Sequence, residues 1–230
     1  MDYTVYENNG MSFSKYLSKC FMWMFLGLLV SFGAAALFSY TGLFLNIFMS
    51  MGTAFIILSS IIEIVLVISL ASSINKLDSS KALTLFFIYS LINGITLSSI
   101  FYVYDLTSII YVFLGSAAVF GIMSVVGYTT KLDLSKLGVF IPIALISMLV
   151  VGIILMFSFS STMYLIYSLI GIGLFMIITT YDIHIIKHMY YSSNSLDAHN
   201  SLAIYGALQL YLDFINIFLH LLALFAKNRD

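Results

Sequence analysis

The sequence has 230 residues, of which 62% are hydrophobic and only 8% are charged, and its formal net charge is −1. A soluble domain of this size cannot bury so much apolar surface, so we expect an all-α, polytopic membrane protein. No basic block suggests nucleic-acid binding. The one cysteine, Cys20, excludes an internal disulfide and a thiolate metal cluster.

Apolar runs of roughly 20 residues recur seven times, and each is long enough to cross a bilayer as a helix. The first run is too long for a signal-peptide core, so we interpret it as a retained helix. Residues 1–230 should therefore form one seven-helix domain with a polar tail over 1–14. The helices are expected near 17–39, 45–74, 82–103, 107–127, 138–158, 163–191 and 201–226.

The basic residues indicate how the chain crosses the membrane. The positive-inside rule predicts a cytoplasmic N-terminus and an external C-terminus, because seven of the nine basic residues would share the N-terminal side. In a rival topology the last span is re-entrant, which would place all nine on that side. About 24 apolar residues are nevertheless enough to cross. The seven residues are Lys15, Lys19, Lys76, Lys81, Lys131, Lys136 and Lys187.

Three acidic residues, Glu63, Asp182 and Asp213, lie inside the predicted spans, and no lysine or arginine lies well inside any span. An ionised carboxylate in hydrocarbon costs at least about 2.5 kcal/mol, so such residues are usually functional. The last two spans form a hairpin, in which Asp182 and Asp213 are about equally far from the connection. Glu63 is expected at a similar depth in the second span.

The last predicted helix carries a polar stripe, because residues spaced three and four apart share one face. Such a stripe can have a purely structural role, in which its side chains join helices through hydrogen bonds. With an acid at its centre, we favour a polar path for ions, lined by Gln209, Asn216 and His220 together with Glu63. The stripe consists of Gly206, Gln209, Asp213, Asn216 and His220.

The pairing of Asp182 with Asp213 predicts a specific chemistry. Two neighbouring carboxylates that are desolvated and lack a basic partner cannot both ionise, so they share a proton or hold a cation. Calcium prefers oxygen ligands of the kind that these aspartates offer. We therefore expect proton and calcium binding at this pair, with no cofactor.

Several segments resemble the transmembrane Bax inhibitor motif family, also called the Bax inhibitor-1 family. The most specific are "TTYDIHII" and "LQLYLDFINIFLHLL", which are similar to its last two helices. The similarity extends to "SSIIEIVLVISL", "FFIYSLINGITLSSIFYVY" and "FGIMSVVGYTTKLDLSKLGVF". The resemblance implies a seven-helix fold with the last helix at the centre.

For bacterial members, the resemblance implies a pH-sensitive calcium leak in the cytoplasmic membrane, gated by two aspartates in the last two helices. Asp182 and Asp213 occupy the matching positions, and Glu63 matches an acid in the second helix. Such proteins also carry an arginine later in that helix, which is thought to bond the aspartates in one state. This chain offers only Lys76 there, as a candidate latch partner.

Other functions are less well supported. A proton-coupled cation transporter or exchanger is the alternative, although neither paired repeats nor broken helices are visible. The spacing of His184 and His188 is found in metal hydrolases, but both point about 120–160° away from Asp182, so we do not expect an enzyme. A light-sensing receptor is not favoured, because no lysine lies within a span to form a Schiff base with retinal. A scaffold protein with the cell-survival role that the family name suggests is compatible with every feature of the sequence. The expected partners are calcium, protons and lipid, and the oligomeric state is not predicted.

Overall fold

The structure is a computed structural model that describes residues 12–72, 79–156, 160–192 and 196–227. Seven helical segments are long and apolar enough to cross a membrane, with α4 and α5 counted as one. This confirms the predicted all-α fold with seven transmembrane helices. The helices of the described ranges are α1 (Phe13–Tyr40), α2 (Leu43–Met51), α3 (Thr53–Ser72), α4 (Ser79–Leu97), α5 (Ile100–Val103), α6 (Leu106–Thr129), α7 (Leu137–Met156), α8 (Ser161–Ser192) and α9 (Leu196–Phe225).

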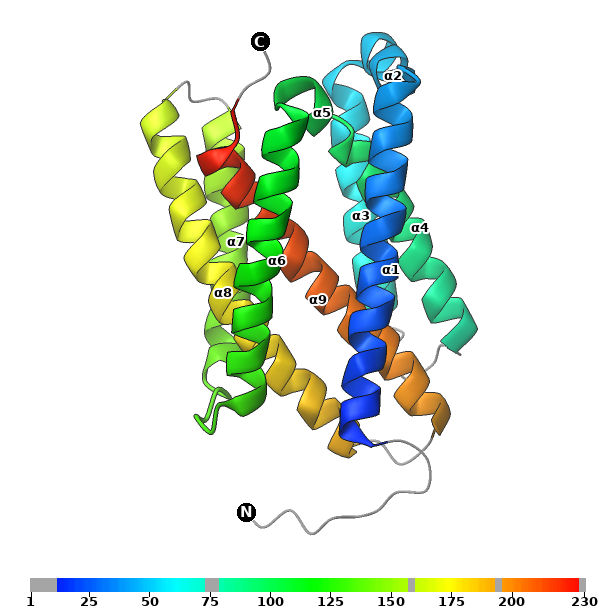
Figure 1. Ribbon diagram of the computed structural model, residues 1–230, viewed down its shortest axis with the longest axis vertical. Helices are drawn as coiled ribbons and strands as arrows, with labels where there is room; N and C mark the ends of the chain where they lie inside the picture. Colours follow the sequence, from blue (N-terminus) through cyan, green and yellow to red (C-terminus); the bar gives the residue numbers. More distant parts are fainter. Residues whose placement is uncertain (1–11, 73–78, 157–159, 193–195, 228–230) are drawn as a thin grey trace.

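The last helix, α9, lies in the middle of the bundle, as the family resemblance implied (Figure 1). It packs against α1, α4, α6 and α8. Half of its most apolar window is buried, compared with 11% for α3 and 6% for α7. Protein surrounds α9, whereas α3 and α7 keep most of their apolar side chains on the outside, where a membrane protein meets lipid.

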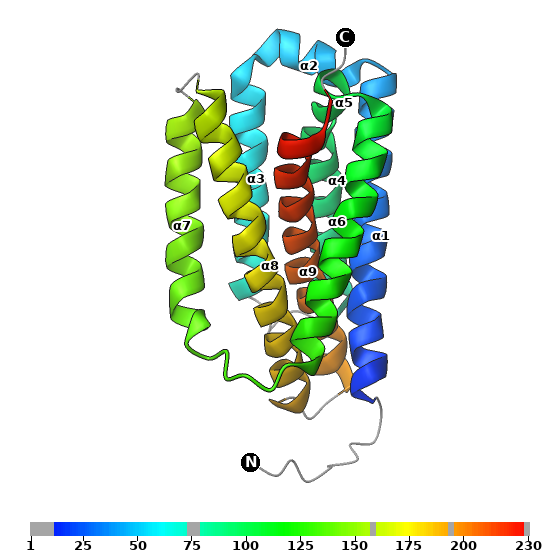
Figure 2. The same ribbon diagram turned by 60° about the vertical axis from the view of Figure 1, so that its left-hand side comes forward.

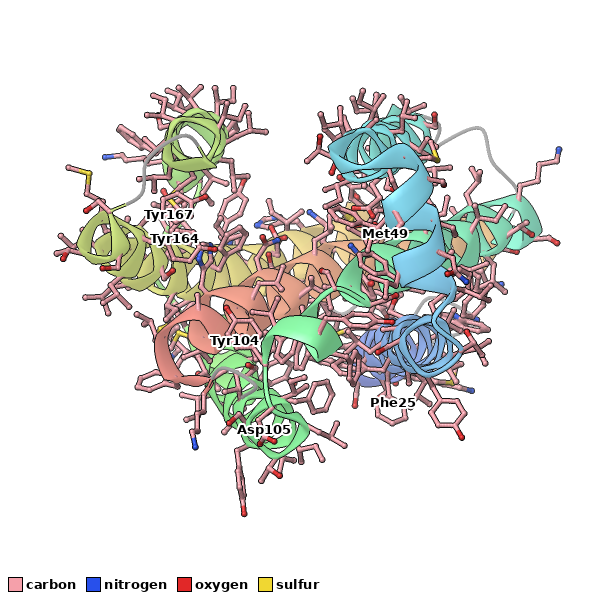
Figure 3. All side chains as sticks on the ribbon, turned by 90° about the horizontal axis from the view of Figure 1, so that it is seen from above. Phe25, Met49, Tyr104, Asp105, Tyr164 and Tyr167 are labelled. Atoms are coloured by element: carbon pink, nitrogen blue, oxygen red, sulfur yellow. The ribbon has the colours of Figure 1, made fainter. Side chains whose placement is uncertain are left out.

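Viewed along the bundle, the helices form three layers (Figure 3). The middle layer contains α8, α9 and α4, the α1 and α6 pair covers one face of it, and α3 and α7 stand over the other. The contacts agree, because α1 and α6 both touch α9, whereas α3 packs on α4 and α7 packs on α8. One face of α9 remains partly exposed as a result. Its residues are Tyr205, Gln209, Leu212, Asn216 and Leu219.

The first helix begins at Phe13, four residues before the predicted start. Ser12 caps it by accepting a hydrogen bond from the backbone N–H of Lys15 at 3.4 Å. The polar residues that follow Ser12 therefore join the helix. The hydropathy of the run marks where the apolar part begins, whereas the cap marks where the helix begins.

The prediction of one continuous helix over 45–74 was wrong. Gly52 interrupts it with φ of 60° and ψ of −145°, a backbone conformation that glycine adopts without a Cβ clash. The preceding segment becomes α2, which crosses the upper end of the bundle between α1 and α3 (Figure 2). Phe44 anchors α2 by packing on Phe55 and Tyr102, with ring centroids 5.9 and 5.7 Å away. The membrane-crossing part of this region is 53–71.

The α1 and α4 helices approach each other closely at Gly94. A Cβ atom added there would collide with the backbone of Ser31 on α1. Small residues allow this kind of close helix packing in membranes, where van der Waals contact replaces the hydrophobic effect between helices. The contact brings Ser31 to the centre of the protein, against both α4 and α9.

Candidate functional site

The α8 and α9 helices lie antiparallel, with the acid pair between them. Their register is visible at three levels: Gly206 faces Ile186, Asp213 faces Thr179, and Gly171 faces His220. At Gly171 the approach is closest, because an added Cβ would overlap the imidazole ring of His220. Three residues of the polar stripe of α9, Gly206, Asp213 and His220, therefore face α8, whereas Gln209 and Asn216 lie on the partly exposed face of α9.

Asp213 is almost completely buried, with 2% of its surface exposed, and Asp182 is 8% exposed. The Thr179 hydroxyl, which donates to the Phe175 carbonyl at 2.8 Å, lies beside Asp213, and Asp182 is close enough for its charge to act on the same carboxylate. The Oδ2 atom of Asp213 has no hydrogen-bond partner among the described residues. Within that part of the chain, no lysine or arginine acts on either aspartate.

This arrangement leaves a buried acceptor without a donor. An unpartnered buried polar group costs about 1–3 kcal/mol, and more when it is charged. Gln209, one turn earlier on the same helix face, adds a second buried acceptor, because its Oε1 has no partner in the described structure. A proton or a cation is what such a group of oxygens can accommodate.

The rest of the stripe does not converge on the aspartates. Asn216 donates to the backbone carbonyl of Leu212 in its own helix at 2.8 Å. His220 packs between Tyr167 and Phe175, with ring centroids 5.4 and 5.9 Å from its own. These two residues lie farther along the α8–α9 interface, toward the end of α9. The predicted path residues are therefore spread along the interface rather than gathered at one site.

Glu63 does not join the aspartates either. It lies on α3, where it accepts hydrogen bonds from Thr96 at 2.9 Å and Asn93 at 3.3 Å, both on α4. Asn93 in turn accepts a bond from Tyr211 of α9 at 2.7 Å. Because Tyr211 and Asp213 are two residues apart on a helix, they project from opposite sides of α9. The acids form two groups with α9 between them.

Two further predicted residues lie apart from this site. Lys76, the candidate latch partner, is outside the described residues. His184 and His188 contact each other, with their Nε2 atoms 3.1 Å apart. The described residues contain no set of three or more His, Cys, Asp or Glu side chains that could hold a metal ion. Among the described residues, the histidine pair therefore has no third side chain of these types beside it.

The sequence analysis missed Thr179, Asn93 and Tyr211. Thr179 could have been found, because it precedes Asp182 by three residues and shares its helix face. Ser90, Asn93 and Thr96 also follow a three-residue spacing on one side of α4. Tyr211 gave no such signal, because a tyrosine in an apolar helix is equally compatible with the core and with the interface.

Comparison with known proteins identifies the family. Residues 13–230 match the family described as inhibitor of apoptosis-promoting Bax1. The chain is 36% identical to the inner membrane protein YbhL of Escherichia coli, over 93% of this chain and 92% of that protein. It is 35% identical to an uncharacterized protein of Borreliella burgdorferi, over 94% of each chain. It is also 40% identical to an uncharacterized membrane protein of Streptococcus pyogenes, over 74% of this chain and 73% of the relative.

The family match covers the acid pair, the central helix and nearly all of the fold. The chain belongs to the Bax inhibitor-1 family and is a multi-pass integral membrane protein.

Proposed function

We propose that this protein is a pH-sensitive calcium leak channel, gated by a proton that Asp182 and Asp213 share. The supporting observation is the unpartnered Oδ2 of Asp213, buried beside a second aspartate inside a membrane-crossing helix. A permanently empty acceptor there would be costly, whereas exchange between a proton and calcium gives it two alternative occupants.

The proton and calcium compete for the same oxygens. Calcium requires deprotonated carboxylates, so its occupancy at the pair falls as the pH falls. Deprotonation also introduces repulsion between α8 and α9, because both aspartates then carry charge. Proton loss therefore changes both the affinity of the site and the force between the helices that carry it.

The packing of α8 on α9 suggests where a gate acts. Gly171 packs against His220 beyond the acid pair, and on the other side of the pair a Cβ atom added at Gly206 would lie 3.1 Å from Ile186. In this proposal, ions reach the aspartates along this interface. A small separation of α8 from α9 would open it, and α6 and α7, which also pack on α8, would have to move with α8 or repack.

The function can be tested by calcium flux into liposomes that contain the purified protein, over a pH series. Asp213→Asn and Asp182→Asn should each flatten the pH dependence, and the double variant should be little different from either, because the pair acts as one unit. Asp133→Asn is a matched control. Asp133 is exposed in the α6–α7 loop, where hydrogen bonds from Ser135 lower its pKa.

Two results would contradict the proposal. If both single variants keep the wild-type pH profile and calcium affinity, Asp213 is only a helix contact. If flux saturates with calcium and requires a proton gradient, the protein is a proton-coupled cation exchanger. The buried pair is suited to either form of proton use, and the gradient dependence separates them.

A further inference from the structure

Glu63 is held differently from the aspartates. Each of its carboxylate oxygens accepts a hydrogen bond, Oε1 from Thr96 and Oε2 from the Asn93 amide. The titratable groups that face it are Tyr89 of α4 and Tyr211 of α9. It is partly exposed. Residues of α4 therefore donate to both carboxylate oxygens of Glu63. Glu63 and Asp213 lie on opposite sides of α9.

Tyr211 connects this group to the central helix. Its side chain is completely buried, and its hydroxyl donates to Oδ1 of Asn93 at 2.7 Å. The Ser31 hydroxyl of α1 lies 2.6 Å from the hydroxyl oxygen of Tyr211. The rings of Phe86 and Tyr89 pack edge-on against Tyr211, with centroids 5.9 and 5.6 Å away. One side chain of α9 is thus fixed by both α1 and α4.

The hydrogen bonds run in one direction, toward Glu63. The Tyr211 hydroxyl donates to the Asn93 carbonyl oxygen, and the Asn93 amide nitrogen donates to the Glu63 carboxylate. Bonds to a charged acceptor are about twice as strong as neutral ones, and bonds in a chain polarise each other. Loss of the negative charge on Glu63 therefore weakens the hold of α4 on Tyr211 as well.

The same helix carries the aspartate site on its other side. Tyr211 and Asp213 are two residues apart on a continuous helix, so one cannot shift or rotate without the other. We infer that Tyr211 is a positioning residue that couples Glu63 to the Asp182–Asp213 pair across α9. A change at Glu63 alters the position of α9, and through it the distance between Asp213 and α8. This inference depends on the acid pair and not on calcium conduction.

Thermal unfolding of the purified protein in detergent micelles tests the coupling without any flux measurement. Glu63→Gln and Asp213→Asn are compared singly and together, first in the wild-type background and then in Tyr211→Phe, which keeps the ring but removes the hydroxyl. In the wild-type background, the double variant should depart from the sum of the single shifts by about 2 °C or more. In Tyr211→Phe the shifts should add.

Tyr102→Phe is the matched control, because it also removes a tyrosine hydrogen bond, from the Tyr102 hydroxyl to the Ser39 carbonyl at 2.9 Å, at the end of the bundle. The coupling should persist in this background. If Tyr211→Phe does not fold, Asn93→Leu interrupts the same chain at its next member. Additive shifts in the wild-type background, or unchanged coupling in Tyr211→Phe, would overturn the inference. An absence of flux in every variant would reject the leak and leave the coupling intact.

Discussion

The acidic residues on the two sides of α9 differ in how many of their carboxylate oxygens have hydrogen-bond partners. Glu63 is the more exposed, yet both of its oxygens accept hydrogen bonds. Asp213 is almost completely buried and has one oxygen without a partner among the described residues. The number of available donors, and not depth alone, thus distinguishes the two acids, and Asp213, the one with a free oxygen, is the one that we propose binds a proton or cation.

The largest expected effect comes from removing the satisfied acid. Glu63→Leu leaves the Asn93 amide without its acceptor, while Thr96 keeps a second bond to the Ile92 carbonyl. The variant should lose about 1–3 kcal/mol of stability, the usual cost of an orphaned buried donor. Thermal unfolding in micelles measures it, and Glu63→Gln should lose less. An unchanged melting temperature would mean that these bonds contribute nothing.

A second variant disturbs only the aspartate side of α9. In Gly171→Ala the new methyl group meets the His220 ring, so the ring or α8 must shift, at a cost of about 1–2 kcal/mol. Calcium flux should rise at every pH if this contact keeps the path closed. Gly173→Ala is the matched control, because a Cβ there meets nothing within 4 Å. Equal behaviour of the two variants would exclude the contact as a gate.

Removing the unsatisfied acid should have a smaller effect of opposite sign. Asp213→Asn should raise stability by about 1 kcal/mol at neutral pH, because it replaces a buried carboxylate with a neutral group of the same shape. If the folded pair retains a proton that the unfolded chain releases, wild-type stability falls as the pH rises. The gain should therefore be larger at pH 8 than at pH 5. A destabilised variant would count against the comparison of the two acids.

Single-cysteine labelling should disturb the protein least, and it tests which end of the bundle faces which side of the membrane. Leu132 lies in the α6–α7 loop and Met49 on α2, at opposite ends of the bundle, and both are exposed. Single cysteines at these positions, in a Cys20→Ala background, should react with impermeant reagents from opposite sides. The positive-inside rule predicts that Leu132 is cytoplasmic. Labelling of Leu132 from outside would reverse the predicted orientation.

Much of the fold could be predicted from the sequence, because membrane crossing depends on the length and polarity of each segment. Counting residues along the hairpin likewise predicts a similar depth for Asp182 and Asp213. The break at Gly52 could not be predicted, since glycine is common within transmembrane helices and the apolar run continues through it. The side of α9 on which Glu63 lies was also hidden. It depends on how α3 and α4 are rotated against α9, and hydropathy does not encode that rotation.

The unequal surroundings of the helices have a consequence for sequence variation. At most positions on α7 the neighbour is outside the protein, and most large apolar side chains there are exposed. A fluid acyl chain adapts to any apolar shape, so these positions can exchange Leu, Ile, Val, Met and Phe freely. On α9 each position has fixed protein neighbours on several sides. Mutational tolerance should therefore rise from the centre of the bundle outward, with α9 the least permissive helix and α7 the most.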